Sequence, residues 1–171
     1  MENLEKYLTL ATHTTAISFA KAEPGPFLLK RPTRKGDATG VSQQMGFATV
    51  LANSNVDPFA SQWLLVTVRK RQGNPYEDRI SIGRASNCDL VLRVPFISKI
   101  QAHILVENDG GYAIRAQNSA TPTLLNDRPV GTSNSLPLKF GDEISFGPMK
   151  FEFIEASRLY KVLISEVRRT P

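Results

Sequence analysis

The sequence predicts an all-β sandwich or barrel over residues 61–155, preceded by an N-terminal arm and followed by one helix. Short apolar segments follow one another at near-regular spacing from Trp63 onward, and turn residues separate them. No helical periodicity interrupts them before residue 155. A chain of 171 residues is long enough to bury a core of this size.

The arm, residues 1–60, has little regular pattern. Apolar residues at three- and four-residue spacing predict a short helix over residues 2–11, while residues 12–20, rich in Thr and Ala, suit a strand or coil. From Glu23 to Ser61, Pro-Gly-Pro, a basic run and small polar residues indicate an irregular segment outside the compact domain. Within it, Phe27-Leu28-Leu29 and Phe47 are expected to pack the arm onto the sandwich.

The predicted strands lie between turn signals such as Gln72-Gly73-Asn74-Pro75 and Asp109-Gly110-Gly111. They are Trp63–Val68, Arg79–Ile82, Leu90–Leu92, Ala102–Val106, Tyr112–Arg115, Pro122–Leu125, Ser135–Leu138, Glu143–Phe146 and Lys150–Ile154.

Residues 156–171 show a different periodicity. Five apolar residues form one stripe at helical spacing, with basic and polar residues opposite: Leu159, Tyr160, Leu163, Ile164 and Val167. We expect a C-terminal amphipathic helix that docks by this stripe.

The distribution of charge disfavours nucleic acid as a partner. The formal net charge of +5 divides into +1 for residues 1–60, +1 for residues 61–155 and +3 for residues 156–171. The basic surplus therefore belongs to the terminal helix rather than to a binding surface.

Composition narrows the class of protein further. With one cysteine, Cys88, an intramolecular disulfide framework is excluded, and two histidines are too few for a dense His/Cys metal site. No run of about 18 apolar residues and no basic-then-apolar N-terminal leader are present. The sequence thus predicts a cytoplasmic protein with no cofactor, no metal and no membrane partner.

The most informative segment runs from Ile82 to Ala102 and contains Gly83-Arg84, Asp89-Leu90-Val91-Leu92 and Ser98-Lys99. Together with Gly141-Asp142-Glu143-Ile144, it resembles the forkhead-associated (FHA) domain family over about residues 61–155. The resemblance implies an eleven-stranded β-sandwich whose loops at one end bind phosphothreonine peptides.

The resemblance places a phosphate site at three residues. Arg84 occupies the family's phosphate-binding arginine position, Ser98 the position of a hydroxyl donor, and Lys99 a loop position that supplies a second charge. An arginine fork suits two phosphate oxygens. The alternatives are ordinary: an ion pair of Arg84 with Asp89 or Asp109, a turn role for Ser98, and a solvated Lys99. Gly83 fits a backbone requirement for an unusual dihedral or a close approach.

The sequence departs from the family at the position three residues after Ser98. The family usually has a buttressing histidine there, and this chain has Gln101, which both donates and accepts hydrogen bonds. His103 lies about 6.6 Å further along a strand and cannot replace it. We expect Gln101 to support the loops and His103 to be a packed strand residue.

A second departure concerns the loop before Thr123. Where the family has Ser-Thr-Asn-Gly-Thr, this chain reads Ser119-Ala120-Thr121-Pro122-Thr123, so a phosphate-assisting hydroxyl and a peptide-binding amide are missing. We predict Thr121, Ser119 and Asn118 as the peptide-contacting residues of this loop. Asn126, just beyond it, is assigned a supporting role together with Gly83 and Gln101.

The predicted function is therefore a non-enzymatic phosphothreonine-peptide-binding adaptor module in Ser/Thr kinase signalling. Its partner is a phosphothreonine-containing protein or peptide, and its oligomeric state is left open. The alternative is a divergent FHA-like domain that makes phosphate-independent protein–protein interactions, as a scaffold or assembly subunit. An enzyme is disfavoured because no nucleophile motif, P-loop or paired-carboxylate motif is present.

Overall fold

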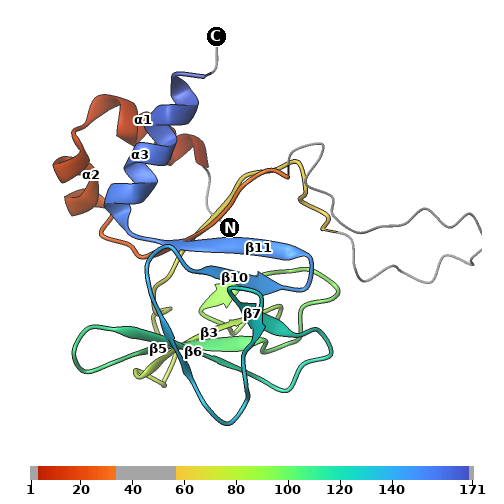
Figure 1. Ribbon diagram of the computed structural model, residues 1–171. Helices are drawn as coiled ribbons and strands as arrows, with labels where there is room; N and C mark the ends of the chain where they lie inside the picture. The colour runs from red at the N-terminus through yellow and green to blue at the C-terminus, as the bar shows by residue number, and fades with distance from the viewer. Residues whose placement is uncertain (1–3, 34–56, 170–171) are drawn as a thin grey trace, which may run out of the picture.

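The computed structural model describes residues 4–33 and 57–169, which form two β-sheets packed face to face and three helices gathered at one end (Figure 1). The six-stranded sheet has the order β2 (Leu64–Thr67), β1 (Phe27–Lys30), β11 (Met149–Ile154), β10 (Glu143–Phe146), β7 (Thr123–Leu125) and β8 (Arg128–Pro129). The five-stranded sheet has the order β4 (Leu90–Val91), β3 (Arg79–Gly83), β5 (Ala102–Val106), β6 (Tyr112–Ala116) and β9 (Leu136–Leu138). The all-β sandwich is confirmed.

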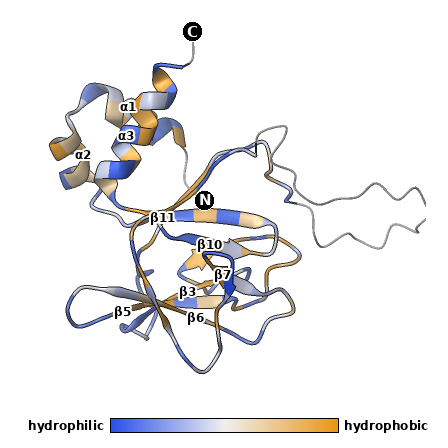
Figure 2. Cartoon of the chain, viewed as in Figure 1, coloured by the Kyte–Doolittle hydropathy of each residue, from blue (hydrophilic) through white to orange (hydrophobic). Residues whose placement is uncertain are grey.

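The core lies between the sheets and follows from the two-residue alternation of the strands. Along β11, apolar and charged residues alternate (Figure 2), and Met149, Phe151 and Phe153 are buried in the core. Ile104 of β5 and Ile144 of β10 join the same cluster from the two sheets. The strand pairs are antiparallel except β3 with β4, which are parallel.

The N-terminal arm contributes a strand to the sandwich, so the packing expected of Phe27-Leu28-Leu29 is confirmed and the expected irregular structure is wrong over Phe27–Lys30. Residues 34–56 of the expected irregular segment, Phe47 among them, lie outside the described residues. β1 pairs on one side with β11 and on the other with β2, and all four of its residues are buried. Leu28 faces the sandwich core, whereas Phe27 and Leu29 face the helices. Because β1 is covered on both faces, its residues do not alternate between apolar and polar. In the sequence, Phe-Leu-Leu-Lys therefore looks like a short apolar patch rather than a strand. Of the eleven strands in the described ranges, ten therefore lie within residues 61–155.

Three helices form a second apolar cluster on the outer face of the six-stranded sheet. They are α1 (Leu4–His13), α2 (Ala16–Ala22) and α3 (Ala156–Val167). Tyr7, Phe19 and Leu159 are fully buried there against Phe27 of β1. The short N-terminal helix and the C-terminal amphipathic helix have counterparts in α1 and α3.

The expectation of a strand or coil over residues 12–20 is wrong, because α2 begins at Ala16. Its start is set by Thr15, whose side chain accepts a hydrogen bond from the Ser18 backbone N–H. Phe19, the buried residue of this helix, packs 5.7 Å from the ring of Tyr160 on α3. No helix in the described ranges is long and apolar enough to cross a membrane.

Candidate functional site

Three connections meet at one end of the sandwich: residues 84–89 after β3, residues 92–101 after β4 and residues 117–122 after β6. The Arg84 backbone N–H donates to the Ser98 carbonyl at 2.9 Å, joining the first connection to the second. The Thr121 hydroxyl donates to the Phe96 carbonyl at 2.8 Å, joining the third to the second. The predicted phosphate-site and peptide-site loops are therefore neighbours.

Gly83 lets the first two connections come into contact. A Cβ atom at this position would lie 2.2 Å from the Lys99 carbonyl oxygen, far inside van der Waals contact. The Gly83 carbonyl in turn accepts from the Leu92 backbone N–H at 2.8 Å. The glycine is required by a close approach of backbone, and this approach sets Arg84 beside Ser98 and Lys99.

The Arg84 side chain is exposed, and it makes no ion pair or hydrogen bond with any other part of the described chain. The two carboxylates that the sequence offers as alternative partners are engaged elsewhere. Asp89 accepts from Ser81, and Asp109 accepts from the Gly111 backbone N–H at 2.8 Å. All the donors of the Arg84 guanidinium are therefore free within the described residues.

Ser98 and Lys99 are held by their backbones and leave their side chains available. The Ser98 N–H donates to Gln101 Oε1 at 3.0 Å, and the Lys99 carbonyl accepts from the Ala85 N–H at 3.2 Å. Neither the Ser98 hydroxyl nor the Lys99 ammonium has a partner within residues 4–33 and 57–169. One hydroxyl donor and two cations thus lie on adjoining backbone segments.

Gln101 connects the second and third connections from inside. Its side chain is fully buried, and its Oε1 accepts from the Ser98 N–H. Its Nε2 lies 3.0 Å from Ser119 Oγ, 2.8 Å from the Thr121 carbonyl and 3.0 Å from Thr123 Oγ1, so two N–H donors serve three acceptors. This arrangement gives Gln101 the loop-supporting position expected from the sequence.

In the third connection, two of the three residues predicted to contact peptide use their hydroxyl protons inside the protein. The Ser119 hydroxyl donates to the Thr121 carbonyl at 2.6 Å, and the Thr121 hydroxyl donates to Phe96, so both protons are used inside the protein. Asn118 is exposed and its amide has no partner in the described chain. Of the three residues predicted to contact peptide, Asn118 alone presents free donors.

Asn126 does not lie with the phosphate-site loops, which corrects its predicted supporting role. It follows β7 at the end opposite Thr121, where its Nδ2 donates to Asp142 at 2.9 Å and its Oδ1 accepts from the Glu143 N–H at 2.9 Å. Asn126 and Asp127 have φ values of 50° and 61°, typical of a tight hairpin turn. Asn126 is only three residues after Thr123 in the sequence, but Thr123 begins β7 and Asn126 lies just beyond the other end of this strand.

His103 is a half-buried strand residue, as expected. Its Nδ1 lies 3.2 Å from Gln117 Nε2, so the amide donates to the ring nitrogen. Burial lowers the pKa of His103, and the cations Arg79 and Arg115 lower it further. The described residues contain no group of three or more His, Cys, Asp or Glu side chains that could hold a metal ion.

Asp89 organises the base of the first connection, a role absent from the sequence-based prediction. Its carboxylate is fully buried and accepts from the Ser81 N–H at 2.7 Å, the Arg71 N–H at 2.8 Å and Asn74 Nδ2 at 2.9 Å. Burial alone raises the pKa of Asp89, but the hydrogen bonds from Ser81, Arg71 and Asn74 outweigh it and lower the pKa. Its partners are 8 to 18 residues away in sequence, so no local pattern reveals them.

A known family matches the part of the chain that contains the three connections. Residues 80–147 match the family model of the FHA domain. These residues form an FHA domain. The match contains all three connections, with Arg84, Ser98 and Gln101 among them.

Several solved structures are similar to the chain. The N-terminal FHA domain of Rad53p from S. cerevisiae, in complex with a phosphothreonine peptide, is 19% identical with a TM-score of 0.46, and 58% of this chain and 90% of that chain are covered. The FHA domain of CT664 from Chlamydia trachomatis is 18% identical with a TM-score of 0.46, covering 76% and 97%. EmbR from Mycobacterium tuberculosis, in complex with a low-affinity phosphopeptide, is 19% identical with a TM-score of 0.43, covering 56% of this chain but only 22% of EmbR. No curated protein matches the sequence.

Proposed function

We propose that this FHA domain binds phosphothreonine peptides and acts as a non-enzymatic adaptor in cytoplasmic Ser/Thr kinase signalling. The phosphate is bound by Arg84, Ser98 and Lys99. The observation that carries the proposal is the unpaired, exposed Arg84 guanidinium, held beside Ser98 and Lys99 by backbone hydrogen bonds.

The chemistry of the three side chains fits a phosphate monoester. Such a group carries close to two negative charges at neutral pH and has three acceptor oxygens. A guanidinium donates to two oxygens at once, a hydroxyl donates to one, and an ammonium compensates the second charge. Because the backbones of the two connections are already joined, little ordering of these loops remains to be done on binding.

The third connection offers the phosphopeptide fewer hydrogen-bond donors than the family pattern implies. Ala120 has no hydroxyl, and the hydroxyls of Ser119 and Thr121 donate inside the protein. Each missing hydrogen bond to a charged group weakens binding by about 1.5–3 kcal/mol, or roughly ten- to a hundredfold. We infer a phosphate-dependent interaction whose peptide contacts are fewer than those the family pattern implies.

The second candidate function is a phosphate-independent protein–protein interaction. The observation that favours it is the same internal bonding of Ser119 and Thr121, which removes two donors from the ligand side. In that case Arg84 contributes no more than an ordinary surface charge.

A binding titration distinguishes the two. A library of threonine peptides is titrated in phosphorylated and unphosphorylated forms against the wild-type chain, Arg84→Ala and Arg128→Ala. Arg128 is an exposed arginine on β8 with no partner in the described chain, so it controls for the loss of one charge. The proposal predicts that phosphorylation strengthens binding in wild type and Arg128→Ala but not in Arg84→Ala. Equal affinity for both forms in the wild type supports the second candidate instead.

A further inference from the structure

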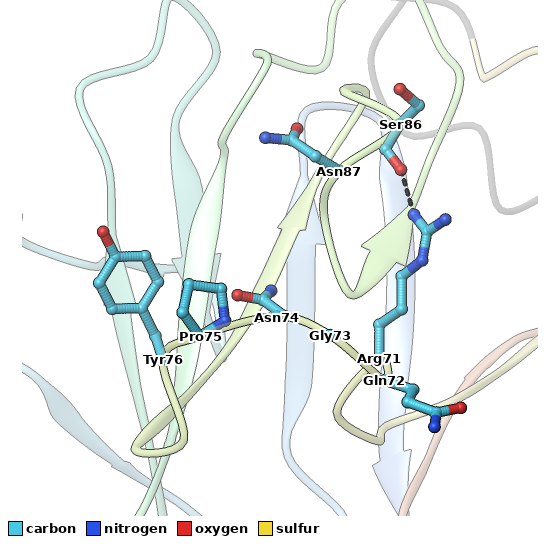
Figure 3. A pocket seen from close by; sticks show the side chains of 8 residues that line it. All are labelled: Arg71, Gln72, Gly73, Asn74, Pro75, Tyr76, Ser86 and Asn87. Atoms are coloured by element: carbon cyan, nitrogen blue, oxygen red, sulfur yellow. Dashed lines mark hydrogen bonds between the residues drawn. The ribbon is translucent and has the colours of Figure 1, made fainter.

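Cavities lie at both ends of the sandwich. One of about 550 Å³ lies beside the connection that carries Arg84 and is crossed by Arg71, whose guanidinium donates to the Ser86 carbonyl (Figure 3). It borders the proposed phosphopeptide site. Another, of about 530 Å³, lies at the other end and is lined from two segments, residues 125–128 and 136–142. The proposed function makes no use of this second cavity, which we call the distal pocket.

The length of the strands separates the distal pocket from the phosphate site. β7 begins at Thr123, next to the third connection, and ends at Leu125, which lines the pocket. On the other side of the pocket, Leu138 at the end of β9 pairs with Tyr112, where β6 begins. The third connection follows the opposite end of β6, after Ala116. A ligand in the distal pocket therefore leaves the phosphate site open.

The distal pocket lies between the edge strands of the two sheets. β8 is the last strand of the six-stranded sheet, and β9 is the last strand of the five-stranded sheet. Each contains a proline, Pro129 in β8 and Pro137 in β9, which has no N–H to donate. These edges do not offer an added strand a continuous row of donors. Recognition at this place therefore depends on the side chains that line the pocket.

Two of those side chains are free cations. Arg128 on β8 is exposed, and it forms no hydrogen bond or ion pair with the part of the chain that the structure describes. Lys139, just after β9, is exposed as well, and its ammonium has no partner there. The pocket thus presents one cation from each sheet edge.

The acidic residues around the pocket are already engaged. Asp142, which lines it, accepts from the Asn126 amide at 2.9 Å and from a backbone N–H at 2.7 Å. These bonds join the turn after β7 to the turn after β9, so the pocket keeps its shape before a ligand enters. Asp127 and Glu143 both pair with Lys150, at 3.1 and 2.7 Å. The charge that complements the two free cations must come from a ligand.

Apolar side chains lie beside the cations. Leu136 lines the pocket and is partly buried against the sandwich core. Phe140, the residue after Lys139, is 50% exposed, and its ring stacks on Phe153 with 5.1 Å between centroids. The stacking holds one face of an aromatic ring toward solvent. Because this apolar surface continues along the chain beyond the pocket, it suits a peptide segment rather than a small molecule.

We propose that the distal pocket binds an acidic segment of a partner protein, in which carboxylates flank an aliphatic side chain. The carboxylates pair with Arg128 and Lys139, and the aliphatic side chain packs against Leu136 and Phe140. The proposal goes beyond the proposed function and does not depend on it. With a phosphothreonine peptide at one end and an acidic segment at the other, a single chain binds two partners at once.

The test uses a fluorescein-labelled, unphosphorylated peptide with two glutamates on each side of one leucine, titrated by fluorescence anisotropy at low salt. Wild type is compared with Arg128→Gln/Lys139→Gln and with Arg84→Gln/Lys99→Gln, which removes the same charge at the other end. We expect the first double variant to bind about three- to thirtyfold more weakly and the second to bind as the wild type does. Replacing the four glutamates of the peptide with glutamine should weaken wild-type binding to a similar extent.

An NMR titration of the isotopically labelled wild type with the same peptide locates the site without any variant. We expect the largest changes in amide chemical shift within residues 125–128 and 136–142. The amides of residues 83–101 should stay unchanged. A saturating phosphothreonine peptide should alter the affinity for the glutamate peptide by less than about twofold.

The inference is overturned if the wild type binds the glutamate and glutamine peptides equally, or if Arg128→Gln/Lys139→Gln binds as the wild type does. It is also overturned if Arg84→Gln/Lys99→Gln loses the glutamate peptide or if the phosphopeptide displaces it, because both results would place the peptide in the phosphate site. If no phosphopeptide binds better than its unphosphorylated form, the proposed function fails. The glutamate-peptide titrations still decide the distal pocket in that case, so the two failures are distinguishable.

Discussion

Replacing Gln101 with Leu tests whether one buried amide holds two of the site's connections together. The volume of the side chain is nearly preserved, but all its hydrogen bonds are lost. The Ser98 N–H and the Thr123 hydroxyl lose the partners that Gln101 supplies. Thr123 is only 2% exposed. The Thr121 carbonyl keeps the hydroxyl of Ser119 as a donor.

The size of the effect follows from that count. A buried polar group left unsatisfied costs about 1–3 kcal/mol, so two such groups predict a loss of about 2–6 kcal/mol in the free energy of unfolding. Gln117→Leu is the matched control, because Gln117 is half-buried and its amide donates to His103 and to its neighbour's carbonyl. We expect the control to lose only about 0.5–1.5 kcal/mol.

The assay is urea unfolding of both variants and the wild type, followed by titration with the best phosphopeptide. Gln101→Leu should lower the unfolding midpoint and weaken phosphopeptide binding together, because the same side chain orders Ser98 and the third connection. If Gln101→Leu unfolds within about 0.5 kcal/mol of the wild type, the assigned role of the amide is wrong.

Three further predictions concern residues near the site and the base of the arm. Gly83→Ala pushes a methyl group into the Lys99 carbonyl, so the free energy of unfolding should fall by at least about 1–3 kcal/mol and the melting temperature should fall with it. An unchanged melting temperature would show that the two backbone segments can move apart at no cost. Lys30 lies 2.9 Å from Asp57, and their side chains are 3% and 8% exposed, so Lys30→Met should cost about 3–5 kcal/mol in denaturant unfolding. The double variant Lys30→Met/Asp57→Leu should recover most of that loss. No recovery would show that the loss in Lys30→Met does not come from the buried, unpaired carboxylate of Asp57. The pKa of Asp89 is lowered in the folded state, so the Asp89 carboxylate contributes fully to the free energy of unfolding above the ordinary pKa of an aspartate. This contribution is lost as the pH falls below about 4. Asp89→Asn should flatten this acid side of the stability profile, and an unchanged profile would place the dependence on other groups.

Much of the sandwich is predictable from the sequence because apolar and polar residues alternate along its half-buried strands. The β5 segment, with Ala102 and Ile104 inward, and the β11 segment are examples. β1 is not recognisable in this way because both its faces are covered, one by the core and one by the helices. α2 is not recognisable from the sequence because β-branched and small residues around Thr15 leave the helical periodicity weak over only seven residues.

The positions of the candidate site residues are predictable where the family pattern specifies backbone geometry. They are less predictable where the role of a residue depends on which acceptor its hydroxyl donates to. Gly83, Arg84 and Ser98 lie together because a close approach and one backbone hydrogen bond require it. Nothing in the sequence tells whether the hydroxyl of Thr121 donates outward or to Phe96, because that depends on a residue 25 positions away. The predicted supporting role of Asn126 is wrong because β7 separates this residue from the connections that form the site.

The proposed function depends on Arg84 making peptide binding sensitive to phosphate. The most direct measurement is the affinity ratio between a phosphothreonine peptide and its unphosphorylated counterpart, taken for the wild type and for Arg84→Ala. We expect a ratio of roughly ten or more in the wild type and a ratio of about one in Arg84→Ala. A ratio of one in the wild type, or a ratio that survives the loss of Arg84, would contradict the proposed function.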